Sequence, residues 1–217
     1  MKLSPKTLLI LKNFATINPS IVIKPGNVLA SIAANKTVLA KTTVPDEFDR
    51  VVSIYAVNRF LSALSLFQDP DVEFGESAAV IRGAQSSITY HYCDPAIVLA
   101  PPDKDIKVPS VDVECTVTNK ALQDVMKAMS VLGLPELAIV GDGDRLTIQA
   151  IDVKNPSADT FSVDLGETDK TFRAVFRSEN IKVIDGDYRV QISAKGLSQF
   201  TGTEATYWIA IEQSSTF

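Results

Sequence analysis

Cysteine and histidine are scarce in this chain, and their scarcity excludes several kinds of site. The 217 residues include two cysteines, Cys93 and Cys115, outside any CxxC pattern, and one histidine, His91. Two separated cysteines form neither a disulfide framework nor a zinc cluster, and they fit a reducing cytoplasm. A single histidine excludes a multi-histidine metal site. Because His91 stands between Tyr90 and Tyr92 in an alternating run, we expect it on a strand face rather than in a catalytic triad.

Long apolar runs and glycine-rich nucleotide motifs are also lacking. No apolar stretch approaches the roughly 20 residues that a membrane-spanning helix needs. The opening segment is a poor signal peptide, because its apolar run Leu8–Leu11 is short and is followed directly by Lys12 and Asn13. No P-loop or Rossmann pattern is present, so nucleotide handling falls to a partner. With 46% hydrophobic and 22% charged residues, the composition is typical of a soluble globular protein, which we expect in the cytoplasm of its host cell.

Fragments that resemble active sites are incomplete. Asp142 and Asp144 form a Gly-Asp-Gly-Asp sequence like part of a calcium loop, but the later ligands of such a loop are absent. We predict a hairpin turn there, and another turn at Asp185–Asp187. No stretch places paired carboxylates among other catalytic residue types, so we predict no catalytic residue, no metal and no cofactor. The aromatic residues Tyr92, Tyr207 and Trp208 could stack on bases, but packing in strands is the better interpretation.

Four segments have helical patterns, and strands separate them. The predicted helices are Ser4–Thr16, Ala56–Phe67, Asn119–Val131 and a short Ser178–Lys182. Serine, threonine and proline at the starts and Gly133 after the third helix are typical of helix ends. The predicted strands include, in order, 21–23, 28–32, 38–42, 51–55, 72–74, 79–81, 88–92, 137–140, 146–151, 161–165, 172–176, 188–194 and 206–212.

The order of helices and strands is the same in the two halves of the chain. A segment with four of the eleven prolines, Cys93–Pro109, separates the halves. We therefore predict an N-terminal domain of residues 1–93, a connector of 94–109 and a C-terminal domain of 110–217. The predicted fold class is α+β, with two similar domains in which helices lie on one face of antiparallel sheets.

Charge is distributed unevenly between the predicted helices and the rest of the chain. The net charge is −5, which by itself argues against nucleic acid. The helices and their approaches contain eight basic and two acidic residues, a net +6, whereas the remaining residues amount to −11. If the helices share one face, that face is basic and fits base-independent contact with phosphates. An ordinary solvated helix face would also be charged, and this alternative stays open. The basic helix residues are Lys2, Lys6, Lys12, Arg59, Lys120, Lys127, Arg177 and Lys182.

Several stretches of the chain together carry a resemblance to a known protein family. The opening Met1–Gly26 is the most specific of them. The others are Ile54-Tyr55 with Asn58, Phe60-Leu61 and Leu64-Ser65-Leu66; Asp94-Pro95 with Val98 and Ala100-Pro101; Asp187-Tyr188; and Ala194-Lys195-Gly196. With these stretches the chain resembles the DNA polymerase sliding clamps of T-even-type tailed bacteriophages, and the resemblance covers essentially the whole chain.

The resemblance implies a non-enzymatic processivity factor. Three copies of two domains each would form a closed homotrimeric ring around duplex DNA, with helices lining the hole and sheets forming the outer wall. The implied partners are double-stranded DNA, held by topology without base specificity, the replicative DNA polymerase, an ATP-driven clamp loader and the late-transcription machinery of such phages. The helix stub at 177–182 is shorter than this pattern requires.

The alternative function is that of a phage structural protein of strand-rich fold, although such a protein would have no need of basic helices.

The resemblance and the charge pattern together suggest three sets of site residues. The DNA-facing candidates are Lys6, Lys12, Arg59, Lys120, Lys127 and Arg177. The subunit-interface candidates lie in 88–92 and 160–165, namely Ile88, Tyr90, Tyr92, Phe161 and Val163. The partner-binding candidates are the apolar connector residues Ile97, Val98 and Leu99.

Overall fold

The computed structural model describes residues 1–104 and 106–217 and divides the chain into two compact units. The first unit is Met1–Lys104 and the second is Asp105–Phe217. The division lies inside the connector predicted at 94–109. Within the described residues, no helix is both long and apolar enough to cross a membrane.

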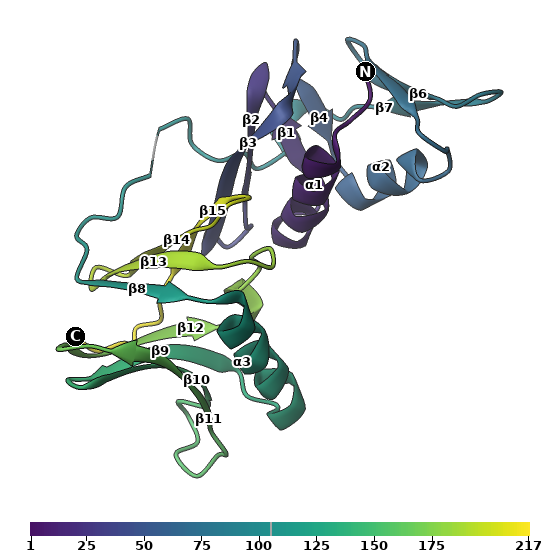
Figure 1. The fold of residues 1–217 in the computed structure, drawn as a ribbon. Helices are drawn as coiled ribbons and strands as arrows, with labels where there is room; N and C mark the ends of the chain where they lie inside the picture. The colour runs from purple at the N-terminus through teal and green to yellow at the C-terminus, as the bar shows by residue number, and fades with distance from the viewer. Residues whose placement is uncertain (105) are drawn as a thin grey trace. The chain divides into compact units, whose positions relative to one another are not determined.

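The first unit contains two α-helices and three small groups of antiparallel strands (Figure 1). Strand β1 pairs with β4, β2 pairs with β3, and β5, β6 and β7 form a three-stranded sheet in that order. The two helices pack on each other, and α1 also packs on β2 and β3. The elements are α1 (Pro5–Ile17), β1 (Ile21–Ile23), β2 (Gly26–Ile32), β3 (Val38–Phe48), β4 (Val52–Ile54), α2 (Val57–Leu64), β5 (Asp71–Phe74), β6 (Ala78–Arg82), β7 (Ser87–His91) and the 3-10 turn η1 (Pro95–Ile97).

Helix α1 begins where its capping chemistry predicts. The Ser4 hydroxyl accepts a hydrogen bond from the Thr7 backbone N–H at 3.1 Å, and Pro5 occupies the first helical position. The Asp46 carboxylate accepts the Ser4 backbone N–H at 2.9 Å and places a negative charge at the positive end of the helix dipole. One face of the helix, which includes Phe14, is buried, so the predicted helix at Ser4–Thr16 is confirmed.

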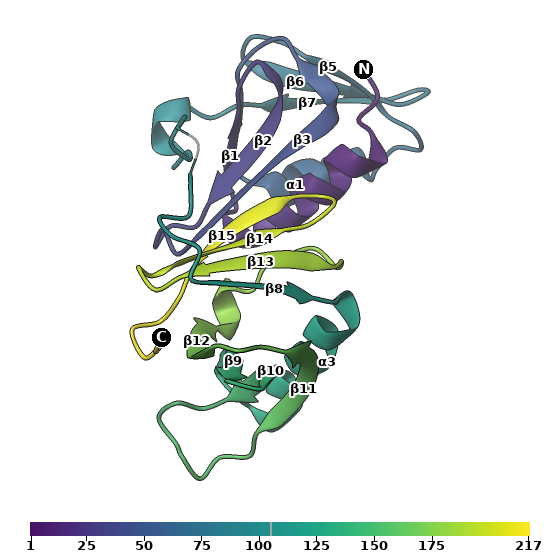
Figure 2. The ribbon, with the colours of Figure 1, turned by 60° about the vertical axis from the view of Figure 1, so that its left-hand side comes forward.

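Among its described residues, the second unit contains one α-helix and two groups of four antiparallel strands (Figure 2). One sheet has the order β11-β10-β9-β12, and α3 packs across β9, β10 and β11. In the other sheet β8, β13, β14 and β15 pair in that order. The elements are β8 (Val113–Val117), α3 (Asn119–Leu132), β9 (Glu136–Asp142), β10 (Arg145–Ile151), β11 (Phe161–Glu167), β12 (Thr171–Arg177), the 3-10 turn η2 (Ser178–Asn180), β13 (Tyr188–Ser193), β14 (Leu197–Thr201) and β15 (Thr206–Ala210).

Local signals define both ends of α3. The Thr118 hydroxyl accepts the Ala121 N–H at 3.2 Å, and Gly133 ends the helix with a φ of 67°, which glycine adopts without the strain of a side chain. A distant turn reinforces the start, because the Asp187 carboxylate accepts the Asn119 N–H at 2.7 Å. Both predicted caps of this helix are confirmed.

Three predictions about elements need correction. The helix predicted at Ser178–Lys182 is only the single 3-10 turn η2, so the second unit has one α-helix where a repeat of the first would have two. Strands β8 and β14 were missed. Strand β8 alternates buried and exposed residues, but it lies beside the proline-rich connector. Strand β14 has the polar sequence LSQFT, in which buried Ser198 donates its hydroxyl hydrogen to the Ile209 carbonyl at 2.7 Å.

The Gly-Asp-Gly-Asp sequence forms the hairpin turn between β9 and β10, as predicted. Its first carboxylate, Asp142, accepts the backbone N–H groups of Asp144 at 3.0 Å and Arg145 at 2.8 Å. These bonds lower the pKa of the Asp142 carboxyl below its usual value. In the part of the chain that the structure describes, no group of three or more His, Cys, Asp or Glu side chains could hold a metal ion.

Candidate nucleic-acid interface and sheet edges

Four of the six candidate DNA-facing residues are exposed on α-helices. Lys12 lies on α1, Arg59 on α2, and Lys120 and Lys127 on α3. The two lysines of α3 are seven residues apart, which is two helical turns, so they lie on the same side. The opposite side of α3 is buried against the sheet through residues that include Leu122, Val125 and Met129.

The two remaining candidates are placed differently. Lys6 on α1 is half-buried, and Arg177 is the last residue of β12 rather than part of a helix. Arg177 lies between two carboxylates, with its Nε 3.1 Å from Glu212 and its Nη1 3.6 Å from Glu179. The Glu212 hydrogen bond and charge raise the pKa of Arg177. Its positive charge is therefore largely neutralised within the chain.

The basic side of α3 is also partly neutralised. The Lys120 ammonium lies 2.5 Å from the Asp124 carboxylate, one turn along the same helix. By contrast, Lys12, Arg59 and Lys127 form no ion pair with any described residue. These three side chains are the helix cations most available to an external anion. Sequence reasoning counted all eight basic residues equally, although the four-residue spacing of Lys120 and Asp124 was a signal for their pairing.

Each candidate interface segment is the edge strand of a sheet. Strand β7 pairs only with β6, and β11 pairs only with β10. The outer side of each strand has no backbone partner among the residues that the structure describes. A free strand edge is a template for pairing with another chain, so β7 in the first unit and β11 in the second are both suited to such pairing.

The side chains predicted at the interface are half-buried in their own unit. Tyr90 packs its ring edge against Phe60, with centroids 5.2 Å apart, and donates its hydroxyl hydrogen to the Ala56 carbonyl at 3.1 Å. The Tyr92 hydroxyl is buried without a hydrogen-bond partner among the described residues, and burial raises its pKa to about 12. Ile88 and Val163 are also half-buried. At these two edges the backbone groups, more than the side chains, are open to a partner.

An open groove of about 620 Å³ lies between α2 and the edge strand β7. Its lining includes Tyr55, Arg59, Leu66 and Ile88. Tyr55 is 65% exposed and Leu66 is 73% exposed, which is a large exposure for apolar side chains. In the second unit, Val131 at the end of α3 is 75% exposed, and α3 packs against the edge strand β11. Both units therefore have exposed apolar side chains on elements that adjoin their free edges.

The partner-binding candidates differ in exposure. Ile97 at the end of η1 is 62% exposed and Leu99 is 40% exposed, but Val98 is only 7% exposed. The Val98 side chain is therefore buried, and Ile97 and Leu99 provide the exposed apolar surface of this segment. Burial also removes Tyr207 from consideration for base stacking, whereas Trp208 is half-buried and donates to Gln199 at 3.1 Å.

Two family models match consecutive parts of the chain. Residues 2–97 match the model described as DNA polymerase processivity factor, and residues 114–213 match the model described as gp45 sliding clamp, C terminal. The chain belongs to the phage sliding-clamp family. Among its curated relatives, the sliding clamp of Enterobacteria phage T4 is 34% identical over 100% of this chain and 99% of the relative. The sliding clamp of Vibrio phage KVP40 is 32% identical over 98% and 99%.

Solved structures share the clamp fold at much lower identity. A PCNA of A. fulgidus, solved with the C-terminal region of FEN-1 bound, has a TM-score of 0.71 and 11% identity over 99% of this clamp chain and 98% of the other. The Helicobacter pylori beta clamp has a TM-score of 0.71 and 12% identity over 98% of this chain and 65% of the other. These likenesses show the fold alone. The family matches give no support to the alternative of a phage structural protein.

Proposed function

We propose that three copies of this chain close into a ring that encircles duplex DNA and tethers a replicative DNA polymerase. The chain would act without catalysis, in the cytoplasm of the infected host. Membership of the processivity-factor family supports the tethering role. The observation that most supports the ring is that β7 and β11 are edge strands of two different sheets, because a closed ring needs two different surfaces that fit each other.

In this ring, β7 of one copy pairs with β11 of the next. The two edges would exchange backbone hydrogen bonds, and apolar side chains beside them would be covered at the same time. Tyr55 and Leu66 beside β7, and Val131 near β11, provide exposed apolar surface for this joint. Phe161 and Val163 would position the β11 backbone from within their own unit.

Contacts with DNA in this proposal are electrostatic and independent of sequence. Lys12, Arg59 and Lys127 are the principal cations, and Lys6 and Lys120 would contribute less. Phosphate contacts of this kind permit sliding, because they read no base. Salt weakens them, since each contact releases counterions from the DNA. Stable association would then depend on the closed ring rather than on affinity.

The proposed protein partners follow from the family resemblance. They are the polymerase, an ATP-driven clamp loader that opens the ring, and the late-transcription machinery of such phages. The exposed apolar residues Ile97 and Leu99 are the proposed partner contact in the first unit. Changing both to serine should weaken polymerase stimulation and leave the assembly mass unchanged. The matched control is Val98→Ser, which should instead lower stability because it places a hydroxyl in a buried position.

Retention on DNA after loading tests the ring directly. The clamp should remain on a nicked circular template during gel filtration and should run off the same DNA after linearisation. Salt should hardly change retention on the circle, because topology and not affinity holds the ring. Equal retention on circular and linear DNA would mean ordinary binding and would refute the proposal.

The assembly mass tests the joint. Light scattering should give three copies for the unaltered chain, and Phe161→Asp in β11 should lower the mass toward a monomer. Thr116→Asp, an exposed change on β8 in the other sheet of the same unit, is the control and should leave the mass unchanged. Circular dichroism of both variants separates loss of assembly from loss of fold. A clean monomer at micromolar concentration for the unaltered chain would contradict the trimer.

A further inference from the structure

The outer edge of β12 is covered by the last residues of the chain. Arg173 donates its N–H to the Thr216 carbonyl at 2.8 Å, and Thr216 donates back to the Arg173 carbonyl at 2.9 Å. Glu212 donates to the Val175 carbonyl at 2.8 Å, and the Ser215 hydroxyl accepts the Val175 N–H at 3.0 Å. Arg173 and Val175 direct these backbone groups away from β9, so this edge has no free hydrogen-bonding positions at its centre.

The ring of Phe217 adds a side-chain contact to this cover. It stacks on Phe172 of β12 with centroids 6.2 Å apart and an angle of 12° between the rings. The residues that cover β12 are therefore held by backbone hydrogen bonds and by an aromatic contact, although they do not form a regular strand.

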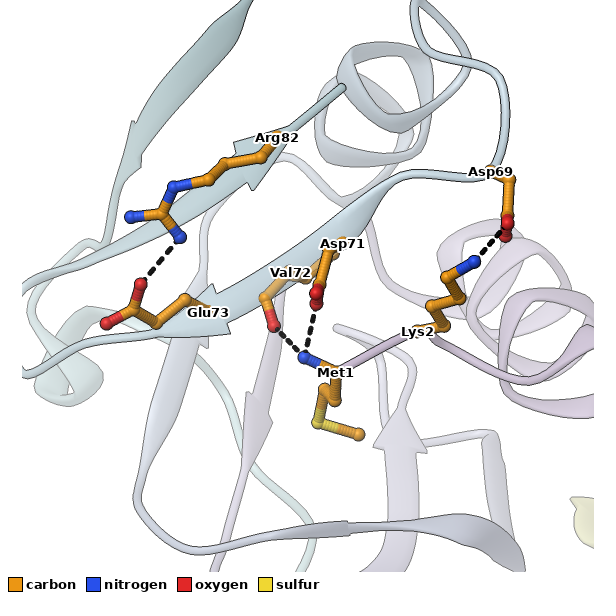
Figure 3. Close-up of polar contacts among 7 residues, drawn as sticks. All are labelled: Met1, Lys2, Asp69, Asp71, Val72, Glu73 and Arg82. Carbon is orange, nitrogen blue, oxygen red and sulfur yellow. Dashed lines mark hydrogen bonds and ion pairs between the residues drawn. The ribbon is translucent and has the colours of Figure 1, made fainter. Parts of the chain in front are cut away.

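The outer edge of β5 is covered in the same way by the first residue (Figure 3). Val72 donates its N–H to the Met1 carbonyl at 2.8 Å, and the Met1 amino nitrogen donates to the Val72 carbonyl at 2.6 Å. The same nitrogen lies 2.6 Å from the Asp71 carboxylate, and Lys2 pairs with Asp69. Pro70 comes just before β5 and has no N–H to offer to a neighbour. A short strand with its central residue occupied cannot accept another strand.

The opposite edges of the same two sheets, β7 and β11, have no such cover among the described residues. We infer that Met1 and the segment Glu212–Thr216 act as edge caps that leave one free edge in each of these two sheets, so that copies of the chain join β7 to β11 and not through β5 or β12. This inference extends the proposed ring, since the joint is the one proposed above.

The physical reason is that strand edges are poorly selective. Backbone N–H and C=O groups are the same along every strand, so an uncovered β12 or β5 would compete with β11 or β7 for the same partners. A joint through the wrong edge has a different rotation, and a head-to-tail contact whose rotation does not close gives an open chain of copies. The caps prevent this because every backbone group at the centre of β12 already has a partner.

A chain shortened to end at Glu212 tests the inference. This deletion uncovers the Arg173 N–H and carbonyl and the Val175 N–H, and it keeps the Glu212 contact. Light scattering after gel filtration should show species heavier than the discrete assembly, in a proportion that rises several-fold with concentration. Adding Arg173→Pro to the shortened chain should restore the discrete mass, because proline removes the exposed donor from the edge. If the shortened chain is folded and has the same mass distribution as the full chain, the inference is overturned.

A milder pair of variants decides the question if the shortened chain fails to fold. Thr216→Pro removes the donor to Arg173, and Thr216→Ala keeps it. Heavier species with proline but not with alanine would support the caps, and equal distributions would overturn them. The same experiment distinguishes failure of the ring proposal from failure of the edge-cap inference. If the ring proposal fails, the unaltered chain is monomeric at every concentration. The comparison between capped and uncapped chains would still report on the edge.

Discussion

The helix cations should contribute unequally to DNA binding, and α3 offers a matched pair to test this. Lys127 has no ion-pair partner among the described residues, whereas Lys120 lies 2.5 Å from Asp124. Both lysines are exposed on the same side of one helix, so Lys127→Gln and Lys120→Gln remove the same charge from similar surroundings. We expect Lys127→Gln to weaken DNA binding more, because the Lys120 charge is already balanced by a neighbouring carboxylate.

The expected magnitude follows from counterion release. Each phosphate contact contributes about 0.9 to the slope of log affinity against log salt concentration, so one Lys127 contact per copy contributes at most about 2.7 in a three-copy ring. Between 50 and 200 mM salt, the unaltered clamp would then lose at most about 40-fold more affinity than the Lys127→Gln variant. For Lys120→Gln we expect a clearly smaller change in slope.

Asp124→Asn is the complementary change. It removes the carboxylate that pairs with Lys120 and keeps the size of the side chain. The variant should bind DNA more tightly at low salt and should show a steeper salt dependence, by at most about 0.9 per copy. Its cost to the helix is small, since an exposed pair four residues apart contributes only about 0.2–0.5 kcal/mol.

Fluorescence anisotropy with a short duplex, measured across a salt series, provides the slopes. Light scattering of each variant confirms that the assembly is unchanged. Equal slopes for the two lysine variants would refute the reasoning from ion pairing. A weaker or unchanged slope for Asp124→Asn would refute it independently.

Two substitutions and one chemical modification test local features of the fold. Thr118→Ala removes the cap at the Ala121 N–H and should lower the unfolding free energy by about 1 kcal/mol in chemical denaturation; the exposed strand change Thr116→Ala is the control, and equal losses would contradict the capping role. Partial burial of Asp46 opposes its ionisation, but hydrogen bonds from Thr7 and Ser4 outweigh this effect and lower its pKa below the usual value of an aspartate. The ionised carboxylate therefore stabilises the fold at neutral pH, and this contribution is lost as the pH falls through the folded pKa. Asp46→Asn should therefore be less stable than the unaltered chain at pH 7, with a difference that disappears in strong acid, and a difference independent of pH would contradict this account. Burial raises the pKa of the Cys115 thiol to about 12. Iodoacetamide at pH 8 should therefore leave Cys115 unmodified in the folded chain and modify it after denaturation, which mass spectrometry can measure. Rapid modification of Cys115 in the folded chain would contradict its burial.

Signals that act within a few residues predicted the helices well. Ser4 and Thr118 cap α1 and α3 as their positions in the sequence indicate, and Gly133 ends α3 in the left-handed conformation. Capping depends on residues three or four apart, so the sequence contains all that is needed. The short length of the fourth predicted helix, Ser178–Lys182, already indicated that it is weak, and in the structure it is a single 3-10 turn.

Interactions between distant residues were not predictable from local patterns. Val98 stands in an apolar stretch of the connector like its neighbours, yet among the connector residues that the structure describes only its side chain is buried. Arg177 was predicted as a DNA-facing cation, but it forms an ion pair with Glu212, which lies 35 positions later in the chain. Strand β14 has too few apolar residues to show an alternating pattern, and its place between β13 and β15 defines it.

The sequence by itself determined the family, the order of helices and strands, and the excess of positive charge on the helices, because these depend on residue identity and short-range periodicity. Only the tertiary structure decided which strand edges are free and which are occupied. The partner of β12 comes from residues near 216 and the partner of β5 is Met1, some 40 and 70 positions away along the chain. Backbone hydrogen bonds between such segments use groups that every residue possesses, so no side-chain pattern marks them, and only the path of the folded chain brings them together.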